Sequence, residues 1–495
     1  MPSRTGLESL STGDLRADLR KRSVRGGLFT LTSQGCTFAI QTISTVVLAR
    51  LLSSADFGIV AMVTTITGLG TAFADLGLSE ATIQREEINH HQISTLFWVN
   101  VAIGLALTAI TAGLAPELAW LYHEPRLLNL TLFLSLTFLI SGLNVQHDAL
   151  LKRDMRFRTV AIRDVSAYAI AVPASIVMAL HGYGYWALAA IPLFVNTVKV
   201  TISWLATGWI PGLPRRVKEV GSMIGFGGNV AACYLIISVN RGMDNVLIGW
   251  YSGAVPLGLY SRAYNLLMLP VRQLSVPAGS VAVPAFSRLQ ADPERFARYY
   301  LRATALLIWL AGPLFSFLFV AAKPVIIVVL SAKWRDAAPV FQILAISALG
   351  QLLLESTVWL LVSRGQSDRL LKLLLVVSPI IIASFAVGLP FGIKGVALSG
   401  SLVLIVICPC MLKVAFRGTE LTLLRLGRAI LCPVLLCFAG ILSAELALRL
   451  AAPQAPVPQL CVAALAFGIT FALSALIPKV REEVRSFSDV IHQSI

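Results

Sequence analysis

The sequence predicts an all-α polytopic membrane protein with about fourteen transmembrane helices. The 495-residue chain is 57% hydrophobic and only 13% charged, and apolar runs of about 20 residues recur along nearly its whole length. Its mean hydropathy of +0.79 indicates more apolar surface than the core of a water-soluble protein could bury. A transmembrane barrel would instead show alternating segments of about ten residues, so helices are expected.

Each expected span contains an apolar run long enough to cross about 30 Å of hydrocarbon at about 1.5 Å per residue. In chain order the spans are 28–52, 57–78, 93–115, 127–150, 160–181, 184–207, 222–250, 257–285, 300–321, 337–362, 370–390, 393–414, 428–450 and 457–478. The run from Pro324 to Leu330 is too short to cross and is expected at the outer interface.

The distribution of basic residues sets the expected orientation, because cytoplasmic loops are enriched in Lys and Arg. Most of the 40 basic residues fall on one side, including the clusters in 152–163 and 215–218. This side is assigned to the cytoplasm, together with both termini and a basic segment, 1–27, in which Leu10, Leu15 and Leu19 suggest an amphipathic helix. The outer side holds only Arg126, Lys323, Lys333, Arg335, Lys394 and Arg449.

The net charge of +15 is therefore a topology signal combined with attraction to anionic membrane lipids, and no nucleic-acid partner is implied.

The seven cysteines lie in or beside apolar spans and are interpreted as buried hydrophobes rather than disulfides or a metal site. Cys408-Pro409-Cys410 resembles the thiolate site of heavy-metal pumps, but such pumps need large cytoplasmic domains that this chain lacks. Neither a metal nor a cofactor is expected.

A weak internal repeat indicates two lobes. Gly27 matches Gly227 and Gly58 matches Gly258 at an offset of about 200 residues, which places the first two spans on the seventh and eighth. An even number of spans per repeat gives two six-helix lobes in parallel repeat, related by an axis along the membrane normal, plus two C-terminal helices. The expected parts are a cytoplasmic segment 1–27, an N-terminal lobe 28–207, a linker 208–221, a C-terminal lobe 222–414, two helices in 415–478 and a cytoplasmic tail 479–495.

Several long segments carry a family resemblance. They are LLSSADFGIVAMVTTITGLGTAFADLGLSEATIQRE, LLKRDMRFR, GYGYWAL, RGMDNVLIGWYSGAVPLGLYSRAYNL, VAVPAFSRLQADPERF and LSAKWRDAAPVFQIL. With these segments the chain resembles the polysaccharide flippases of the multidrug/oligosaccharidyl-lipid/polysaccharide exporter superfamily, in particular the exopolysaccharide and colanic-acid-like branch. The resemblance extends over nearly the whole chain.

The resemblance implies translocation of undecaprenyl-pyrophosphate-linked oligosaccharide repeat units across the bacterial inner membrane, beside a polysaccharide polymerase and a chain-length regulator. No G-x-x-x-x-G-K-[ST] loop is present, so ATP hydrolysis is not expected. Two alternatives stay open. A polysaccharide polymerase or ligase should carry a large outer loop with catalytic residues, whereas the longest outer connection expected here is about fifteen residues, so no enzyme is expected. A small-molecule multidrug exporter for cationic drugs should have an acidic cavity, whereas the central helices carry more Arg than Asp or Glu.

An anionic pyrophosphate needs a polar, positively charged path through hydrocarbon, and arginine can bind phosphate oxygens in a bidentate manner. The candidate substrate-binding residues lie on the first, seventh and eighth spans; they are Arg241, Arg272, Arg262, Arg50, Asn240, Asn265 and Gln41. Arg50 and Arg262 could equally extend to the membrane interface, and the amides could equally bond neighbouring helices.

Two carboxylates are candidates for ion coupling, Asp244 and Glu355. Arg241 and Asp244 are three residues apart and share a helical face, so they can form an ion pair. Arg241 either neutralises the substrate's pyrophosphate or belongs to this pair for structural reasons alone, and the sequence leaves both interpretations open.

Overall fold

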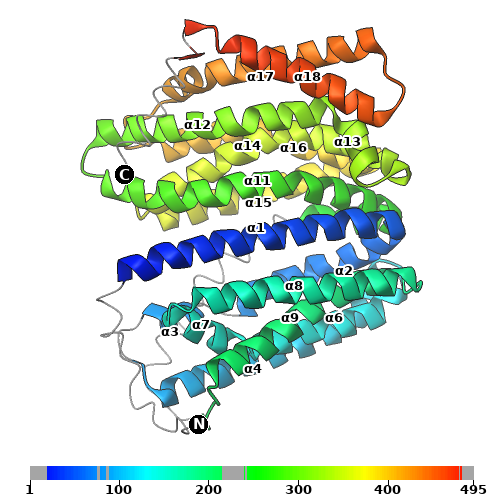
Figure 1. The fold of residues 1–495 in the computed structure, drawn as a ribbon, viewed down its shortest axis with the longest axis vertical. Helices are drawn as coiled ribbons and strands as arrows, with labels where there is room; N and C mark the ends of the chain where they lie inside the picture. The colour runs from blue at the N-terminus through cyan, green and yellow to red at the C-terminus, as the bar shows by residue number, and fades with distance from the viewer. Residues whose placement is uncertain are drawn as a thin grey trace. The chain divides into compact units, whose positions relative to one another are not determined.

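The computed structural model describes residues 19–74, 78–84, 88–214, 239, 242–478 and 480–481. Within these ranges the chain is almost entirely helical and contains no strand. It forms two compact units, Met1–Gly258 and Leu259–Ile495 (Figure 1). The expected lobe boundaries stay a prediction.

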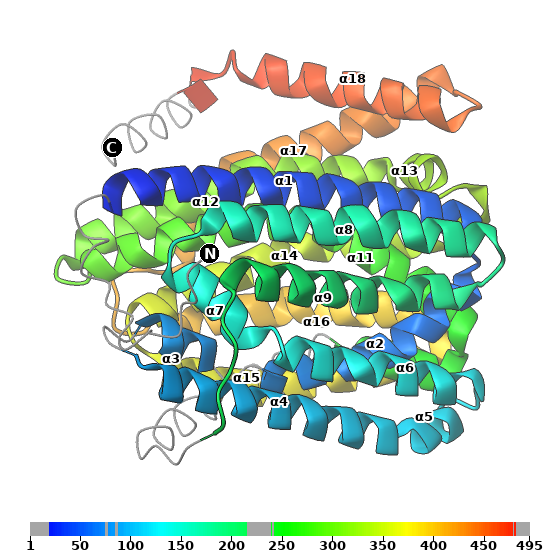
Figure 2. The same ribbon diagram turned by 60° about the horizontal axis from the view of Figure 1, so that its bottom comes forward.

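The first unit is a bundle of long helices with two short helices, α3 and α7, that contact each other at one end (Figure 2). Helix α8 packs against both α1 and α9, while α6 packs against α2, α4 and α9. The helices are α1 (Leu19–Leu51), α2 (Ser54–Ala74), α3 (Leu78–Gln84), α4 (His90–Gly113), α5 (Ala115–Leu121), α6 (Arg126–Gly142), α7 (Val145–Arg153), α8 (Phe157–Leu180) and α9 (Tyr185–Thr207). Residues 242–252 are also helical.

The second unit contains most of α11 and all later helices. Helix α14 packs against α12 and α16, α16 against α15, and α17 against α12 and α18. The elements are α11 (Ala254–Arg288), α12 (Pro293–Val320), α13 (Ala322–Val329), η2 (Ala332–Ala337), α14 (Ala338–Ser363), α15 (Ser367–Gly388), η3 (Leu389–Phe391), α16 (Gly392–Ala415), α17 (Leu423–Ala451) and α18 (Pro456–Ser474).

The helix positions follow the expected spans closely. Among the described residues, 10 candidate spans are long and apolar enough to cross a membrane, and one of them, Ser367–Ala415, contains both α15 and α16. The all-α polytopic class is therefore confirmed, whereas the number of fourteen crossings stays a prediction. The short run at Pro324 forms α13, an eight-residue helix. Most of the expected span 222–250 lies outside the described residues.

Helix α1 differs from its expected span at the N-terminal end. It begins at Leu19, so the last part of the segment expected as a separate amphipathic helix continues directly into α1. Leu10 and Leu15 lie outside the described residues. The continuous helix is compatible with the sequence because no proline separates residues 19–27 from the apolar run, and α1 continues through the Gly26-Gly27 pair that could have ended it.

Three helices begin with a side-chain cap at ends expected to face the cytoplasm. Asn89 and Gln92 form a reciprocal capping box at the start of α4, Asp292 caps α12, and Thr422 caps α17. Each cap supplies an acceptor for a backbone N–H that has no partner within its helix. These polar caps fix where the apolar helices begin.

Two glycines bring α2 and the start of α11 into backbone contact. A Cβ added at Gly58 would lie 1.8 Å from the carbonyl oxygen of Ala254, and one added at Gly258 would lie 1.8 Å from that of Ser54. The contact is reciprocal, as at an isologous interface, and the matched residues have the offset of about 200 found in the sequence. Only glycine permits so close an approach.

Candidate functional site

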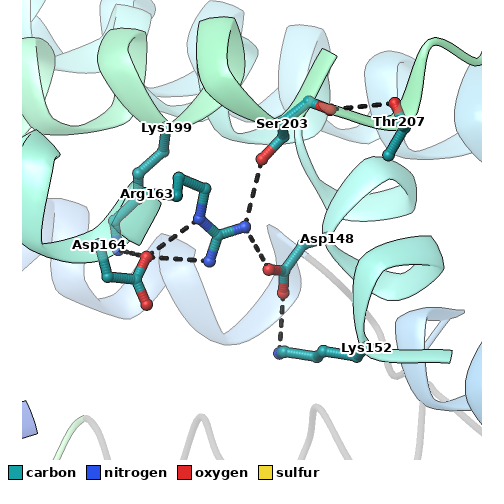
Figure 3. A network of polar contacts seen from close by, with 7 residues as sticks. All are labelled: Asp148, Lys152, Arg163, Asp164, Lys199, Ser203 and Thr207. Atoms are coloured by element: carbon teal, nitrogen blue, oxygen red, sulfur yellow. Dashed lines mark hydrogen bonds and ion pairs between the residues drawn. The ribbon is translucent and has the colours of Figure 1, made fainter. Parts of the chain in front are cut away.

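A network of charged side chains crosses three helices of the first unit. Its centre is Arg163 of α8, whose side chain is 5% exposed. The guanidinium forms an ion pair with Asp148 of α7 and donates from Nη1 to Ser203 Oγ of α9 at 3.2 Å. Nε and Nη2 both donate to Asp164 Oδ1, at 3.0 and 2.9 Å (Figure 3). The planar guanidinium thus joins three helices.

Two lysines extend this network in opposite directions. Lys152 Nζ lies 2.7 Å from Asp148 Oδ2, and Lys199 Nζ lies 3.3 Å from Asp164 Oδ1 (Figure 3). Three cations share two carboxylates, so the network carries one positive charge in excess. Lys199 and Asp164 keep 25% and 29% of their side chains exposed. These two groups thus keep part of their surface outside the packed interior, whereas Arg163 is buried.

The partly exposed end of the network lies well inside apolar helices. Lys199 precedes the last residue of α9, Thr207, by eight positions, about 12 Å along the axis. Its ammonium group also lies over the ring of Tyr168, 5.9 Å from the ring centroid. The Tyr168 side chain is hydrogen-bonded to Gln41 of α1. Charged residues at such depth are costly in a membrane protein and mark ligand or ion sites more often than structural positions.

A second set of buried polar contacts fixes α7 against its neighbours. Arg153 Nη1 donates to the carbonyl oxygen of Thr82 at 2.8 Å, and Thr82 Oγ1 donates to Gln146 Oε1 at 2.8 Å. His147 Nδ1 lies 2.8 Å from Thr207 Oγ1, and its ring lies 4.4 Å from that of Trp204. These contacts fix α7 against α3 and against the end of α9. Asp148, which is also on α7, is thereby held in place within the charged network.

The residues expected from the sequence lie in several places. Asn240 and Arg241 lie outside the described residues. Arg50 is exposed in the last turn of α1, while Gln41, half-buried on the same helix, contacts the charged network through Tyr168. Asp244 is 4% exposed on the segment 242–252. Its expected ion pair with Arg241 therefore stays a prediction.

The remaining candidates belong to the second unit. Arg262, Asn265 and Arg272 lie on α11, where Arg262 is half-buried and the other two are exposed. The spacing of Asn265 and Arg272 places them on one side of that helix. Glu355 is half-buried on α14. Within the second unit, three of the polar candidates thus share a single helix.

The sequence interpretation missed Asp164 and Lys199, and it assigned Arg163 to a cytoplasmic loop. Helix α8 begins at Phe157 rather than at residue 160, so Arg163 and Asp164 lie nearly two turns inside it. A signal for Lys199 was present, because it is the one charged residue of the 23-residue helix α9. Its partners could not be identified, because they belong to other helices.

The described residues contain no group of three His, Cys, Asp or Glu side chains that could hold a metal ion. Cys408 is buried on α16, whereas Cys410 is exposed. The two thiols therefore do not converge on one position.

Comparison with known proteins assigns the family. Residues 47–339, more than half of the chain, match the family model described as "Polysaccharide biosynthesis protein". The chain belongs to this family. It is 25% identical over 337 residues to the lipopolysaccharide biosynthesis protein WzxC of Escherichia coli (strain K12), covering 67% of this chain and 68% of WzxC. It is 26% identical over 321 residues to the succinoglycan biosynthesis transport protein ExoT of Rhizobium meliloti (strain 1021), covering 64% and 65%.

Two solved structures show the fold of this family member. The lipid II flippase MurJ, in an inward closed conformation, has a TM-score of 0.70 and 14% identity, covering 90% of this chain and 98% of MurJ. A multidrug resistance MATE family transporter of the MOP superfamily has a TM-score of 0.59 and 15% identity, covering 81% and 95%. The resemblance stated from the sequence is confirmed, and both folds are those of membrane transport proteins.

Proposed function

We propose that this protein translocates undecaprenyl-pyrophosphate-linked oligosaccharide repeat units from the cytoplasmic to the periplasmic leaflet of the bacterial inner membrane. The observation that carries the proposal is the match to the polysaccharide biosynthesis family together with a flippase-like fold over 90% of the chain. The relative named as a succinoglycan biosynthesis transport protein supports the same class of substrate. The translocated units supply exopolysaccharide biosynthesis.

The charged network of the first unit fits the chemistry of such a substrate. Its positive excess, with Lys199 partly exposed at the end of the network, offers an attractive site for a diphosphate within apolar helices. When substrate is absent, the ammonium group of Lys199 pairs with the Asp164 carboxylate. This ion pair reduces the free-energy cost of keeping a charged lysine among apolar helices. Transfer of the ammonium from Asp164 to phosphate would couple binding to a rearrangement of α8 and α9.

On this proposal transport proceeds by alternating access of the two lobes without ATP hydrolysis, with both termini in the cytoplasm. A polysaccharide polymerase and a chain-length regulator act on the translocated units.

Arg241, which lies outside the described residues, is a further candidate to contact the pyrophosphate. Arg241→Ala should abolish polymer export at normal membrane abundance if Arg241 contacts substrate. If it serves only to pair with Asp244, the same change should lower abundance, and adding Asp244→Ala should restore it.

The test of the proposed function is the sidedness of lipid-linked intermediates in a deletion strain. Complete repeat units should accumulate on the cytoplasmic face, and wild-type protein supplied in trans should restore export. A Lys199→Met protein present at normal abundance should leave the intermediates accumulated. Correctly translocated but unpolymerised units would instead indicate a polymerase. Normal export in the deletion strain, with altered sensitivity to cationic drugs, would indicate a multidrug exporter.

A further inference from the structure

The second unit contains an apolar groove between α11 and α12, with Trp359 of α14 at its side. Its volume is about 450 Å³. Phe286 and Ala282 form a buried floor, being 1% and 7% exposed, whereas Val281 and Leu310 are exposed on its rims, at 72% and 58%. The α11–α12 groove is therefore a built, open depression rather than a flat apolar helix face.

The dimensions of the α11–α12 groove suit one extended hydrocarbon chain. Along α11 its lining runs from Gln273 to Phe286, about 20 Å at the rise of an α-helix. This length exceeds the thickness of one hydrocarbon leaflet, about 15 Å. Ala278 and Ala303 line the groove with only methyl groups, which leaves room for a chain between the helices.

One cation lies in the lining of the α11–α12 groove. Arg302 of α12 is exposed and makes no hydrogen bond or ion pair with any residue that the structure describes. Helix α12 has 28 residues and is about 42 Å long, so about 12 Å of it extends beyond the hydrocarbon. Arg302 lies about 13 Å from the helix start, near the depth at which hydrocarbon meets phosphate.

Two more exposed arginines precede Arg302 on the same side of α12. Arg295 and Arg298 are spaced at i, i+3 and i+7 with Arg302, so the three follow one face of the helix. The carboxylate of Asp292, which lies near them, is engaged as the helix cap by the backbone N–H of Arg295. Glu294, also exposed in the first turn, and Asp292 offset two of these three charges, so this end of the helix keeps one positive charge in excess. Apart from Arg302 and Gln273, the groove lining is predominantly apolar.

We propose that the α11–α12 groove binds the polyprenyl chain of a phosphorylated polyprenyl lipid, with Arg302 against its phosphate. The occupant rests on the proposed function, since a translocated unit linked to undecaprenyl pyrophosphate carries such a chain. A single groove with a cation in its lining matches a lipid with one chain and one anionic head. A two-chain phospholipid would leave its second chain outside. The groove lets the lipid tail stay in hydrocarbon while the head group moves.

The test is binding of undecaprenyl phosphate to the purified full chain, measured by native mass spectrometry in zwitterionic nanodiscs. Ala303→Trp fills the groove and Arg302→Gln removes its cation, so each should weaken binding at least tenfold. The matched controls are Ala439→Trp and Arg428→Gln, both at exposed positions of α17, and they should bind as wild type does. Monodisperse elution of all four variants checks that they are folded.

Unchanged binding by both groove variants would overturn the inference. So would equal binding of phosphatidylglycerol and undecaprenyl phosphate, because the groove would then be a general lipid surface. Failure of the proposed function is distinguishable, since it is measured by the sidedness of intermediates in cells. A deletion strain that exports polymer normally would refute the proposed function whatever the binding result.

Discussion

Removing the cation at the centre of the charged network should destabilise the first unit. In Arg163→Gln, Asp148, 18% exposed, keeps only the exposed Lys152 as a partner. Breaking a buried ion pair in this way costs about 3–5 kcal/mol, and the partial exposure of Asp148 favours the lower end, about 3 kcal/mol. At about 2–4 °C per kcal/mol, the midpoint of thermal unfolding should fall by on the order of 6–12 °C.

The assay is thermal unfolding of detergent-purified protein, with three variants compared with wild type. The double change Arg163→Gln with Asp148→Asn should recover at least half of the fall in unfolding temperature. It removes both charges of the Arg163–Asp148 pair, so no buried carboxylate is left without its arginine. The matched control is Arg158→Gln, at an exposed position of the same helix, which should change stability by less than about 0.5 kcal/mol. Wild-type stability of Arg163→Gln, or no recovery in the double variant, would show that the Arg163–Asp148 ion pair does not stabilise the first unit.

Three further predictions concern Lys199, Gly258 and the membrane topology. Lys199→Met should abolish polymer export at normal membrane abundance, and Lys199→Arg should retain partial export; full export by Lys199→Met would contradict a substrate role. Gly258→Ala should strongly reduce membrane abundance, measured by immunoblot, because its Cβ would lie 1.8 Å from the carbonyl oxygen of Ser54. A normal level would show that α2 and α11 can move apart at this contact without loss of stability. Cysteine-accessibility labelling should find residues 154–156, between α7 and α8, cytoplasmic and residues 251–253, before α11, periplasmic, and the reverse would overturn the topology.

The helices were predictable from the sequence because the thickness of hydrocarbon sets the length of each apolar run. Helix α9, Tyr185–Thr207, differs by one residue from the expected span 184–207. Its end is marked by Gly208, which adopts a left-handed conformation with φ of 59°. Helix α8 was placed less accurately, because Arg163 and Asp164 near its start resemble a solvated loop until their partners are known.

The charged network was not predictable for a different reason. Asp148 and Lys199 belong to separate helices, and their common contact with Arg163 and Asp164 depends on how α7, α8 and α9 pack. A single sequence contains no direct record of that packing. The pairing of Gly58 with Gly258 was visible as a repeat, but their reciprocal backbone contacts with α11 and α2 required the structure.

The proposed movement of a lipid-linked oligosaccharide across a bilayer can be measured with purified components. Proteoliposomes are prepared with the purified full chain and the undecaprenyl-pyrophosphate-linked repeat unit, and a glycosidase is added outside. Without translocation the glycosidase digests only the glycan of the outer leaflet. With wild-type protein nearly all glycan should be digested, and with Lys199→Met only the outer-leaflet share. Digestion limited to that share with wild-type protein, as in protein-free vesicles, would contradict the proposed movement.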